Sequence, residues 1–293
     1  MDALVVAARI AQFLGAAVLF GTPLFALYNR AGVDRRLLLV AALLTLAGGV
    51  VALGVQTASM AGDAAAIGDP TMIWAVASGT QFGRGLSVRL AATVLALAAL
   101  ALPPGPRSPA VALVGAIVMG SFAWTGHGAA DDGTAGLAHV AADVLHLLAA
   151  GVWIGALAGL LSLLPRGRSG AELAQLHAAL AGFSGVGSMA VAVLLLSGLV
   201  NSWFLVGPSR IVDMPSSTYG LLLLAKLALF AAMLGLAAAN RFRLTPALGA
   251  SLDGDPSAAV AALRRSLLLE TGAGVLVLAI VGWMGAIAPL SAS

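Results

Sequence analysis

The sequence has no cysteine and very few charged residues. Of its 293 residues, only 9% are Asp, Glu, Lys or Arg, whereas 60% are hydrophobic and the mean hydropathy is +1.03. Soluble domains carry about 25% charged residues, so this composition cannot cover a surface that faces water. It excludes a soluble enzyme, a nucleic-acid-binding protein and a disordered chain.

The absence of cysteine excludes disulfides, thiolate metal sites and cysteine nucleophiles. With four histidines and eight methionines, the chain can offer imidazole, carboxylate and thioether groups to a metal ion. Nothing in the sequence resembles a P-loop or another motif for ATP hydrolysis. Transport, if it occurs, is then not driven by ATP hydrolysis on this chain, and we expect no enzymatic activity unless the chain is a redox protein.

Long apolar runs predict an all-α polytopic membrane protein, because a hydrocarbon core of about 30 Å needs about 20 apolar residues per helix. A β-barrel would instead have short segments of alternating polarity. Eight runs are long enough, near residues 3–28, 37–58, 86–102, 109–126, 137–164, 179–206, 219–239 and 266–288. The third and fourth are separated only by a proline cluster at 103–109, which predicts a tight helical hairpin.

Arginine is concentrated in alternate loops. Loops 29–36, 103–108, 165–178 and 240–265 together hold ten arginines. The other loops hold Arg84 and Arg210, together with five aspartates. Since basic loops stay in the cytoplasm, both termini are predicted to lie outside, which is the periplasm for a bacterial inner membrane.

The two halves of the chain resemble each other. The stretch Arg9–Gly21 aligns with Asp143–Gly155 at an offset of 134 residues, and the third and seventh spans align at an offset of 137. Four spans per half is an even number, so the pattern predicts two parallel four-helix halves, residues 1–127 and 128–293. Where the first half has Arg9 and Gln12, the second half has Asp143 and His146, which can bind a metal.

The fifth predicted span carries three ionisable side chains, His139, Asp143 and His146. Their spacing of i, i+4 and i+7 places them on one helical face, and Trp153 continues the same stripe. Ionisable groups in a span usually face the bundle interior. At 1.5 Å per residue the two histidines are about 10 Å apart, too far for one ion to bind both directly.

His127 ends the fourth span in the stretch AWTGHG, residues 123–128, just before an acidic loop. We expect it at the same outer level as His139. Imidazole and carboxylate groups suit Cu(II) or Zn(II), and thioether suits Cu(I). The predicted metal ligands are His127, His139, Asp143 and His146. The positions that could support them are Met119, Trp153, Asn201, Lys226, Arg9, Arg89 and Glu270.

Each of these residues could instead have a structural role that involves no metal. Asp143 could pair with Lys226, Arg89 or Arg9 as a buried ion pair. His139 could be an interfacial side chain, and His127 could be solvated in its loop. Asn201 could form an interhelical hydrogen bond. Glu270 lies close in sequence to Arg264 and Arg265, which favours a local ion pair.

The stretch DVLHLLAAGVWIGALAGL, residues 143–160, resembles the signature helix of the CopD/PcoD copper-resistance membrane family. The stretches 123–128, 183–207 and 219–243 resemble the helices around it, and the final span with Glu270 also fits. The resemblance is strong from about residue 120 to 290. Over the first four spans, only the number of helices and the hydrophobic pattern support it.

The resemblance implies a bacterial inner-membrane protein that moves copper, commonly from periplasm to cytoplasm. It also implies a periplasmic CopC-like copper-binding protein as partner. We expect that partner to be a separate chain, because the sequence has no room for a fused domain. Two alternatives stay open: a redox protein that binds haem b through two histidines at one depth, and a metal-free accessory subunit. The oligomeric state is not indicated.

Overall fold

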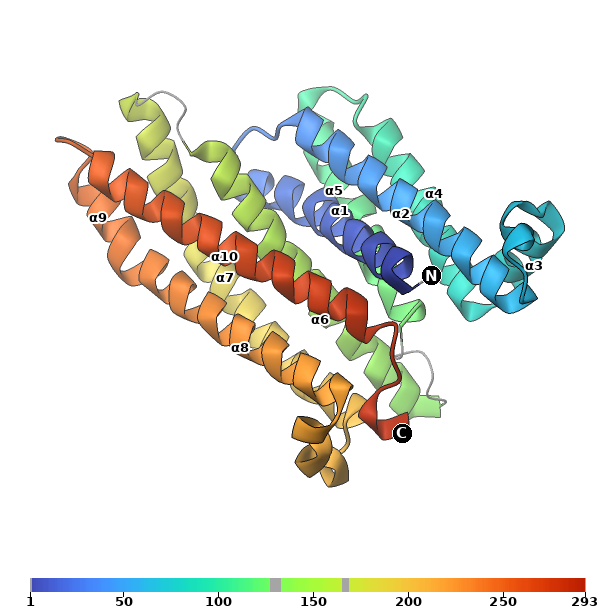
Figure 1. Cartoon of the computed structure of the whole chain (residues 1–293). Helices are drawn as coiled ribbons and strands as arrows, with labels where there is room; N and C mark the ends of the chain where they lie inside the picture. Colours follow the sequence, from blue (N-terminus) through green and yellow to red (C-terminus); the bar gives the residue numbers. More distant parts are fainter. Residues whose placement is uncertain (1, 127–132, 165–168, 293) are drawn as a thin grey trace.

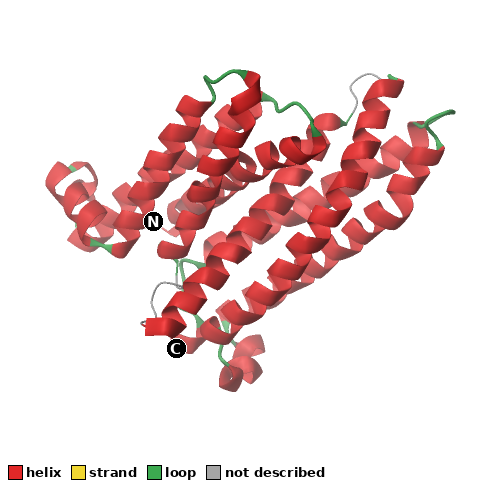
Figure 2. Ribbon diagram, turned by 180° about the vertical axis from the view of Figure 1, so that it is seen from behind, coloured by secondary structure: helices red, strands yellow, loops and turns green. Residues whose placement is uncertain are grey.

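The computed structural model describes residues 2–126, 133–164 and 169–292 and consists of helices and loops over these ranges (Figures 1 and 2). Eight helices are long and apolar enough to span a membrane, as predicted. They are α1 (Asp2–Asn29), α2 (Arg35–Ala61), α4 (Gln81–Ala99), α5 (Pro104–Gly120), α6 (Gly133–Leu163), α7 (Gly170–Leu205), α8 (Thr218–Ala239) and α10 (Ser257–Met284).

Shorter elements lie at the ends of these helices. They are η1 (Ala64–Gly68), α3 (Pro70–Gly79), η2 (Ser121–Trp124), η4 (Pro208–Ser216), the π-helical turn η5 (Asn240–Leu244), α9 (Thr245–Ala250) and η6 (Leu290–Ala292). The π-turn connects α8 directly to α9, so the seventh span continues without a loop from Thr218 to Ala250.

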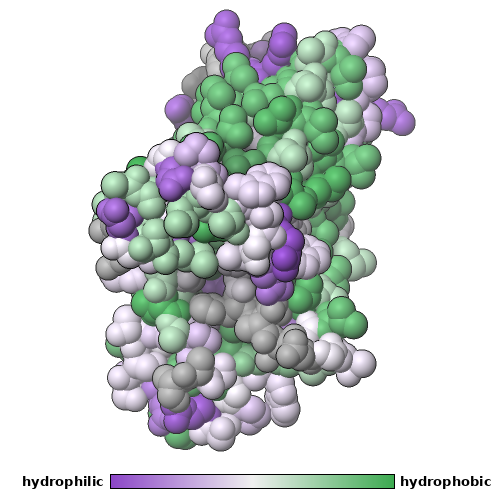
Figure 3. Space-filling view, turned by 90° about the vertical axis from the view of Figure 1, so that its right-hand side faces the viewer, coloured by the Kyte–Doolittle hydropathy of each residue, from purple (hydrophilic) through white to green (hydrophobic). Residues whose placement is uncertain are grey.

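The outer surface of the bundle is apolar. Large side chains such as Leu113, Leu199 and Met189 are exposed along the helices. Figure 3 shows hydrophobic residues over much of the upper half of one face, below a hydrophilic upper edge, and hydrophilic residues at mid-height and at the lower end. Lipid tails can cover such a surface and water cannot, so the protein is an all-α polytopic membrane protein.

Two helices begin nine residues before the predicted spans. Helix α7 starts after a capping box, in which Ser169 accepts from the Glu172 backbone N–H and the Glu172 carboxylate accepts from the Ser169 N–H. Helix α10 extends through Arg264 and Arg265, which are exposed, while Leu263 beside them is buried. These extensions are amphipathic, so a search for apolar runs does not find them.

Helices α1 and α6 form the centre of the bundle and pack against each other. On one side, α1 also packs on α2 and α5, and on the other side α6 packs on α7 and α10. Figure 1 shows α2, α4 and α5 grouped on one side and α7, α8 and α10 on the other. This grouping is compatible with two four-helix halves, but the boundary at residue 127 stays a prediction.

The long segment between α2 and α4 forms η1 and α3, at the end of the bundle. Trp74 of α3 is 73% exposed, and Met72 and Ile67 are also exposed. Exposed apolar and aromatic side chains at the end of a membrane bundle are typical of the lipid–water interface.

Candidate functional site

A cavity of about 250 Å³ lies between the two helix groups. All eight spanning helices contribute to its lining, through the N-terminal parts of α1, α4, α6 and α8 and the C-terminal parts of α2, α5, α7 and α10. These parts lie at the end of the bundle that we predict to be periplasmic. We call this cavity the outer cavity.

The predicted polar face of α6 lines the outer cavity. His139, Asp143 and His146 all contribute to its wall. His139 is buried and stacks on the Phe204 ring, with centroids 4.4 Å apart and planes 7° apart. Asp143 and His146 are half-buried. The helical spacing therefore predicted correctly that the three side chains share one face.

Ser197 of α7 orients His146. The His146 Nδ1 lies 3.0 Å from the Ser197 Oγ, and that hydroxyl donates to the Val193 carbonyl. A hydroxyl that donates to the Val193 carbonyl offers its lone pairs to His146, which favours the tautomer with the proton on Nδ1. The lone pair of Nε2 is then available, which is the arrangement found in histidine ligands whose other N–H donates to an acceptor.

Asp143 accepts a hydrogen bond from Asn201 of α7, with Nδ2 3.3 Å from Oδ1. The interhelical role foreseen for Asn201 is thus correct, and its own Oδ1 is buried without a hydrogen-bond partner. Among the described residues, no ion pair within 4 Å joins Asp143 to Lys226, Arg9 or Arg89. Asp143 therefore forms no close salt bridge with these three side chains, and the alternative that its charge is only structural stays a prediction.

Arg89 of α4 is buried and is held by neutral groups. Its guanidinium donates to Ser121 Oγ, Gln12 Oε1 and Thr125 Oγ1 at 3.0, 2.8 and 2.7 Å, and it lies 3.4 Å over the Phe122 ring. These contacts satisfy all its nitrogens without a carboxylate.

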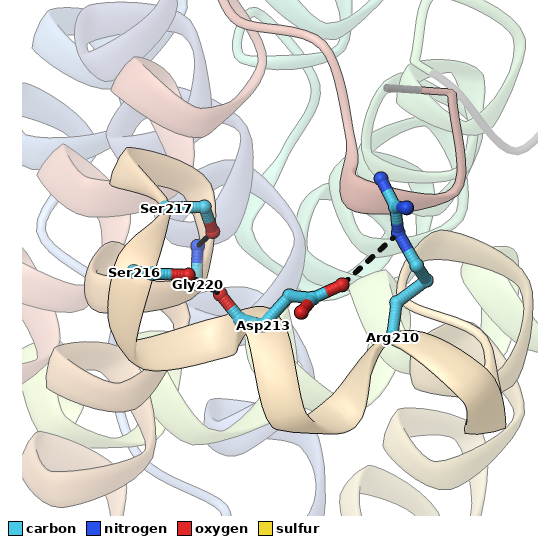
Figure 4. Close-up of polar contacts among 5 residues, drawn as sticks. All are labelled: Arg210, Asp213, Ser216, Ser217 and Gly220. Carbon is cyan, nitrogen blue, oxygen red and sulfur yellow. Dashed lines mark hydrogen bonds and ion pairs between the residues drawn. The ribbon is translucent and has the colours of Figure 1, made fainter.

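Arg9 and Lys226 are the other two cations in the lining of the outer cavity, and both are half-buried. The Arg9 guanidinium lies against Gly285, the residue directly after α10, where a Cβ would collide with it. Lys226 lies two turns into α8. The Ser217 hydroxyl caps this helix by accepting from the Gly220 N–H (Figure 4). The four charged groups of the wall are thus three cations and Asp143.

The loop before α8 has its own charge pair. Arg210 and Asp213 of η4 are 3.4 Å apart, and the Ser216 hydroxyl donates to the Asp213 carbonyl (Figure 4). In this pair Asp213 offsets the charge of one of the two arginines in the loops predicted to lie outside. Most of the positive charge in the loops therefore lies on the other side, in the arginine-rich loops.

Met119 of α5 is buried and lines the outer cavity. Trp153 and Glu270 do not belong to this site. They line a second cavity toward the other end of the bundle, where the Trp153 indole donates to Glu270 Oε1 at 2.7 Å. The expected ion pair of Glu270 with Arg264 or Arg265 is wrong, because both arginines are exposed and neither lies within 4 Å of it.

No group of three or more His, Asp or Glu side chains that could hold one metal ion occurs within residues 2–126, 133–164 and 169–292. His139, Asp143 and His146 share a wall without forming one coordination shell. His127 lies outside the described residues. Haem ligation gains no support in this part of the chain, because His139 and His146 project from the same helix rather than from facing helices.

Sequence reasoning missed the residues that hold the site in place. Ser197, Phe204 and Thr125 contact His146, His139 and Arg89, respectively. A single serine, threonine or phenylalanine in an apolar run carries no signal of its own, since its partner lies on another helix.

Two family models match the chain. The model described as copper resistance protein D-like, N-terminal domain, matches residues 1–137, and the model described as copper resistance protein D matches residues 177–284. The chain is also 38% identical over 303 aligned residues to copper resistance protein D of Pseudomonas syringae pv. tomato, covering 98% of this chain and 97% of that relative. No solved structure matches the chain.

Proposed function

Because the chain belongs to the copper resistance protein D family, we propose that it carries copper across the bacterial inner membrane, from the periplasm to the cytoplasm. Copper is the cargo in this proposal, and His139, Asp143 and His146 are the first residues of the protein that it meets inside the membrane. His127 is proposed as a further ligand at the entrance.

One observation carries the proposal. Two imidazoles, a carboxylate and the thioether of Met119 line a single cavity at one end of an otherwise apolar bundle. These groups are the copper ligands available to a chain without cysteine. Their spread of about 10 Å along α6 suits an ion that passes from ligand to ligand better than an ion held permanently.

Elemental analysis of the detergent-purified protein for copper, zinc and iron is the first test. We expect about one copper per chain after loading with copper, and much less in His146→Ala. Stoichiometric iron would contradict the proposal and favour haem. Absence of every metal, together with copper accumulation in cells that is equal for wild type and His146→Ala, would overturn it in favour of an accessory subunit.

The proposed direction requires the outer cavity to face the periplasm. Since the chain has no cysteine, single cysteines can report the side of each loop. We expect Ser209→Cys, in η4, to react with a membrane-impermeant maleimide in spheroplasts. Asp253→Cys, exposed in the loop after α9, should react only after the membrane is broken. The reverse pattern would contradict the orientation.

The proposed partner is a periplasmic CopC-like copper-binding protein as a separate chain. Such a carrier would deliver copper to the end of the bundle where His139 lies. Copper transfer from the loaded carrier to the purified membrane protein is the test. We expect the transfer to depend on His139, and transfer that is unchanged in His139→Ala would contradict delivery at this end.

A further inference from the structure

The second cavity, of about 270 Å³, lies within the C-terminal helix group. Its wall comes from α6, α7, α8 with the π-turn, and α10. On α6 it begins at Trp153, ten residues beyond Asp143, which corresponds to about 15 Å along the helix. We call it the inner cavity, since it lies toward the arginine-rich end of the bundle.

Glu270 is the acidic side chain in the wall of the inner cavity and is 1% exposed. Both of its oxygens accept hydrogen bonds from neutral donors, Oε1 from the Trp153 indole at 2.7 Å and Oε2 from the Asn240 amide at 2.8 Å. Among the described residues, no basic group lies within 4 Å of it. A carboxylate in a membrane span without a cation is costly and is usually functional.

Asn240 is suited to a carboxyl group that changes its protonation state. It is 7% exposed, and its Oδ1 is buried without a hydrogen-bond partner. While Glu270 is ionised, the Asn240 amide N–H donates to it. When Glu270 carries a proton, a half-turn of the amide lets Oε2–H donate to the free Oδ1 instead. The bond from Trp153 to Oε1 is kept in both states.

Asn240 also begins the π-helical turn of residues 240–244. Single π-turns inside α-helices frequently occur at functional sites, and this one directs a polar amide into the bundle. The sequence there changes from an apolar run to Asn240–Arg241, so the amide lies at the inner limit of the apolar part of α8.

We propose that Glu270 is a proton-binding site and that a proton is taken up and released there during each transport cycle. The inference rests on the proposed copper transport and identifies the ion that accompanies the copper. The step is a simple protonation: a proton from the aqueous phase binds one carboxylate oxygen and later leaves from it, with no other bond formed or broken.

An apolar layer separates this site from the outer cavity. Trp153 contacts Phe230 in an edge-to-face arrangement, with centroids 5.9 Å apart. Leu194 and Met233 are buried in the same hydrophobic cluster. The proposed copper ligands and the proton site therefore lie on opposite sides of an apolar barrier. A transporter needs such a barrier so that its binding path is not open to both sides of the membrane at once.

Few charged groups face Glu270 from the surrounding helices. Arg241 lines the same cavity, but its guanidinium donates to the Ser184 carbonyl and the Ser188 hydroxyl of α7. On α10, Arg264 and Arg265 are exposed. The α6 and α7 residues of the inner cavity carry no charge. The proton site is thus governed by Trp153, Asn240 and the apolar wall.

The test uses proteoliposomes that contain a trapped pH-sensitive dye and the full-length protein. We expect copper uptake by the wild type to change the internal pH, and its sign to give the direction of proton movement. In Glu270→Gln the copper-dependent pH change should disappear and copper uptake should fall at least tenfold. Glutamine keeps the shape and both hydrogen bonds, because its amide can donate to Asn240 Oδ1, so the variant should fold.

Glu172→Gln is the matched control, since Glu172 is the other glutamate of the chain and is exposed. It should behave like the wild type. If the wild type and Glu270→Gln move copper equally, or the wild type moves copper without any pH change, the proton site is overturned while transport stands. If the wild type moves no copper, the proposed function fails.

Infrared titration of the purified protein then still decides about Glu270. Because every acidic side chain gives a carbonyl band when it is protonated, the contribution of Glu270 is the difference between the pH-dependent spectra of the wild type and of Glu270→Gln. In that difference one carboxyl band should appear and vanish with pH at a position typical of a buried group, whereas Glu172→Gln should lose only the band of an exposed carboxyl group. A spectrum of Glu270→Gln that equals the wild type would overturn the inference without reference to copper.

Discussion

Gly21 of α1 and Gly155 of α6 lie against each other, backbone to backbone, where the two central helices cross. A Cβ on Gly155 would collide with the Cα of Gly21, and a Cβ on Gly21 would collide with the Gly151 carbonyl. The Thr22 hydroxyl donates to the Gly155 carbonyl at 3.1 Å across the same crossing. The two glycines are also equivalent positions of the predicted repeat, and equivalent residues meet each other only near a two-fold axis.

Gly155→Ala should therefore destabilise the protein by about 1–3 kcal/mol, because the added methyl group forces the central helices apart. Gly185→Ala in α7 is the control, since a Cβ there meets no atom within 4 Å. Thermal unfolding in detergent should show a lower midpoint for Gly155→Ala alone. Equal unfolding midpoints for the two variants would mean that α1 and α6 can move apart at their crossing without loss of stability.

Ser197→Ala should weaken copper binding by about tenfold without removing a ligand, which is the usual effect of losing the hydrogen bond behind a histidine ligand. His146→Ala should abolish binding at this site. His177→Ala, on the part of α7 that we predict to be cytoplasmic, should have no effect on copper. Titration of the purified variants with copper measures all three. If Ser197→Ala bound copper as tightly as the wild type, the proposed role of Ser197 behind His146 would be contradicted.

Asp143→Asn should abolish copper accumulation at an unchanged protein level. The asparagine keeps the size of the side chain and an oxygen that accepts from Asn201, so only the negative charge is lost. Metal content of cells that express equal amounts of protein is the readout. Accumulation equal to that of the wild type would mean that the carboxylate is structural.

Lys226→Leu should strengthen copper binding. A unit charge at about 10 Å from an ion, in an effective dielectric of about 20, opposes binding by about 1.7 kcal/mol, which is more than tenfold in affinity. Leucine keeps an apolar side chain at this position and adds no thioether that could itself bind copper. The measurement is the copper affinity of the purified variant, and a weaker affinity would indicate that Lys226 organises the ligands instead of repelling the ion.

The eight spans and the shared face of His139, Asp143 and His146 could be predicted because both follow from patterns local to one helix. The partners of Glu270 could not. Trp153 and Asn240 are 117 and 30 residues away from it in sequence, and nearby arginines made a local ion pair the simpler expectation. The structure instead turns those arginines outward and the carboxylate inward.

The partners of the buried cation Arg89 could not be predicted from the sequence either. A buried arginine in a membrane protein predicts a carboxylate partner, and Asp143 was a candidate. The actual partners are a glutamine on α1 and a serine, an aromatic ring and a threonine in and directly after η2. None of these residue types stands out in an apolar sequence, and their convergence depends on how α1, α4 and η2 pack.

The neutral surroundings of Arg89 have a consequence for selectivity. No carboxylate among its contacts offsets its positive charge, so Arg89 opposes every cation that enters the outer cavity, in proportion to the charge of that cation. Sodium and potassium gain little from imidazole or thioether groups, whereas copper gains much. A wall that repels all cations and offers strong bonds only to soft or borderline ones would thus reject the abundant alkali ions and admit the rare metal.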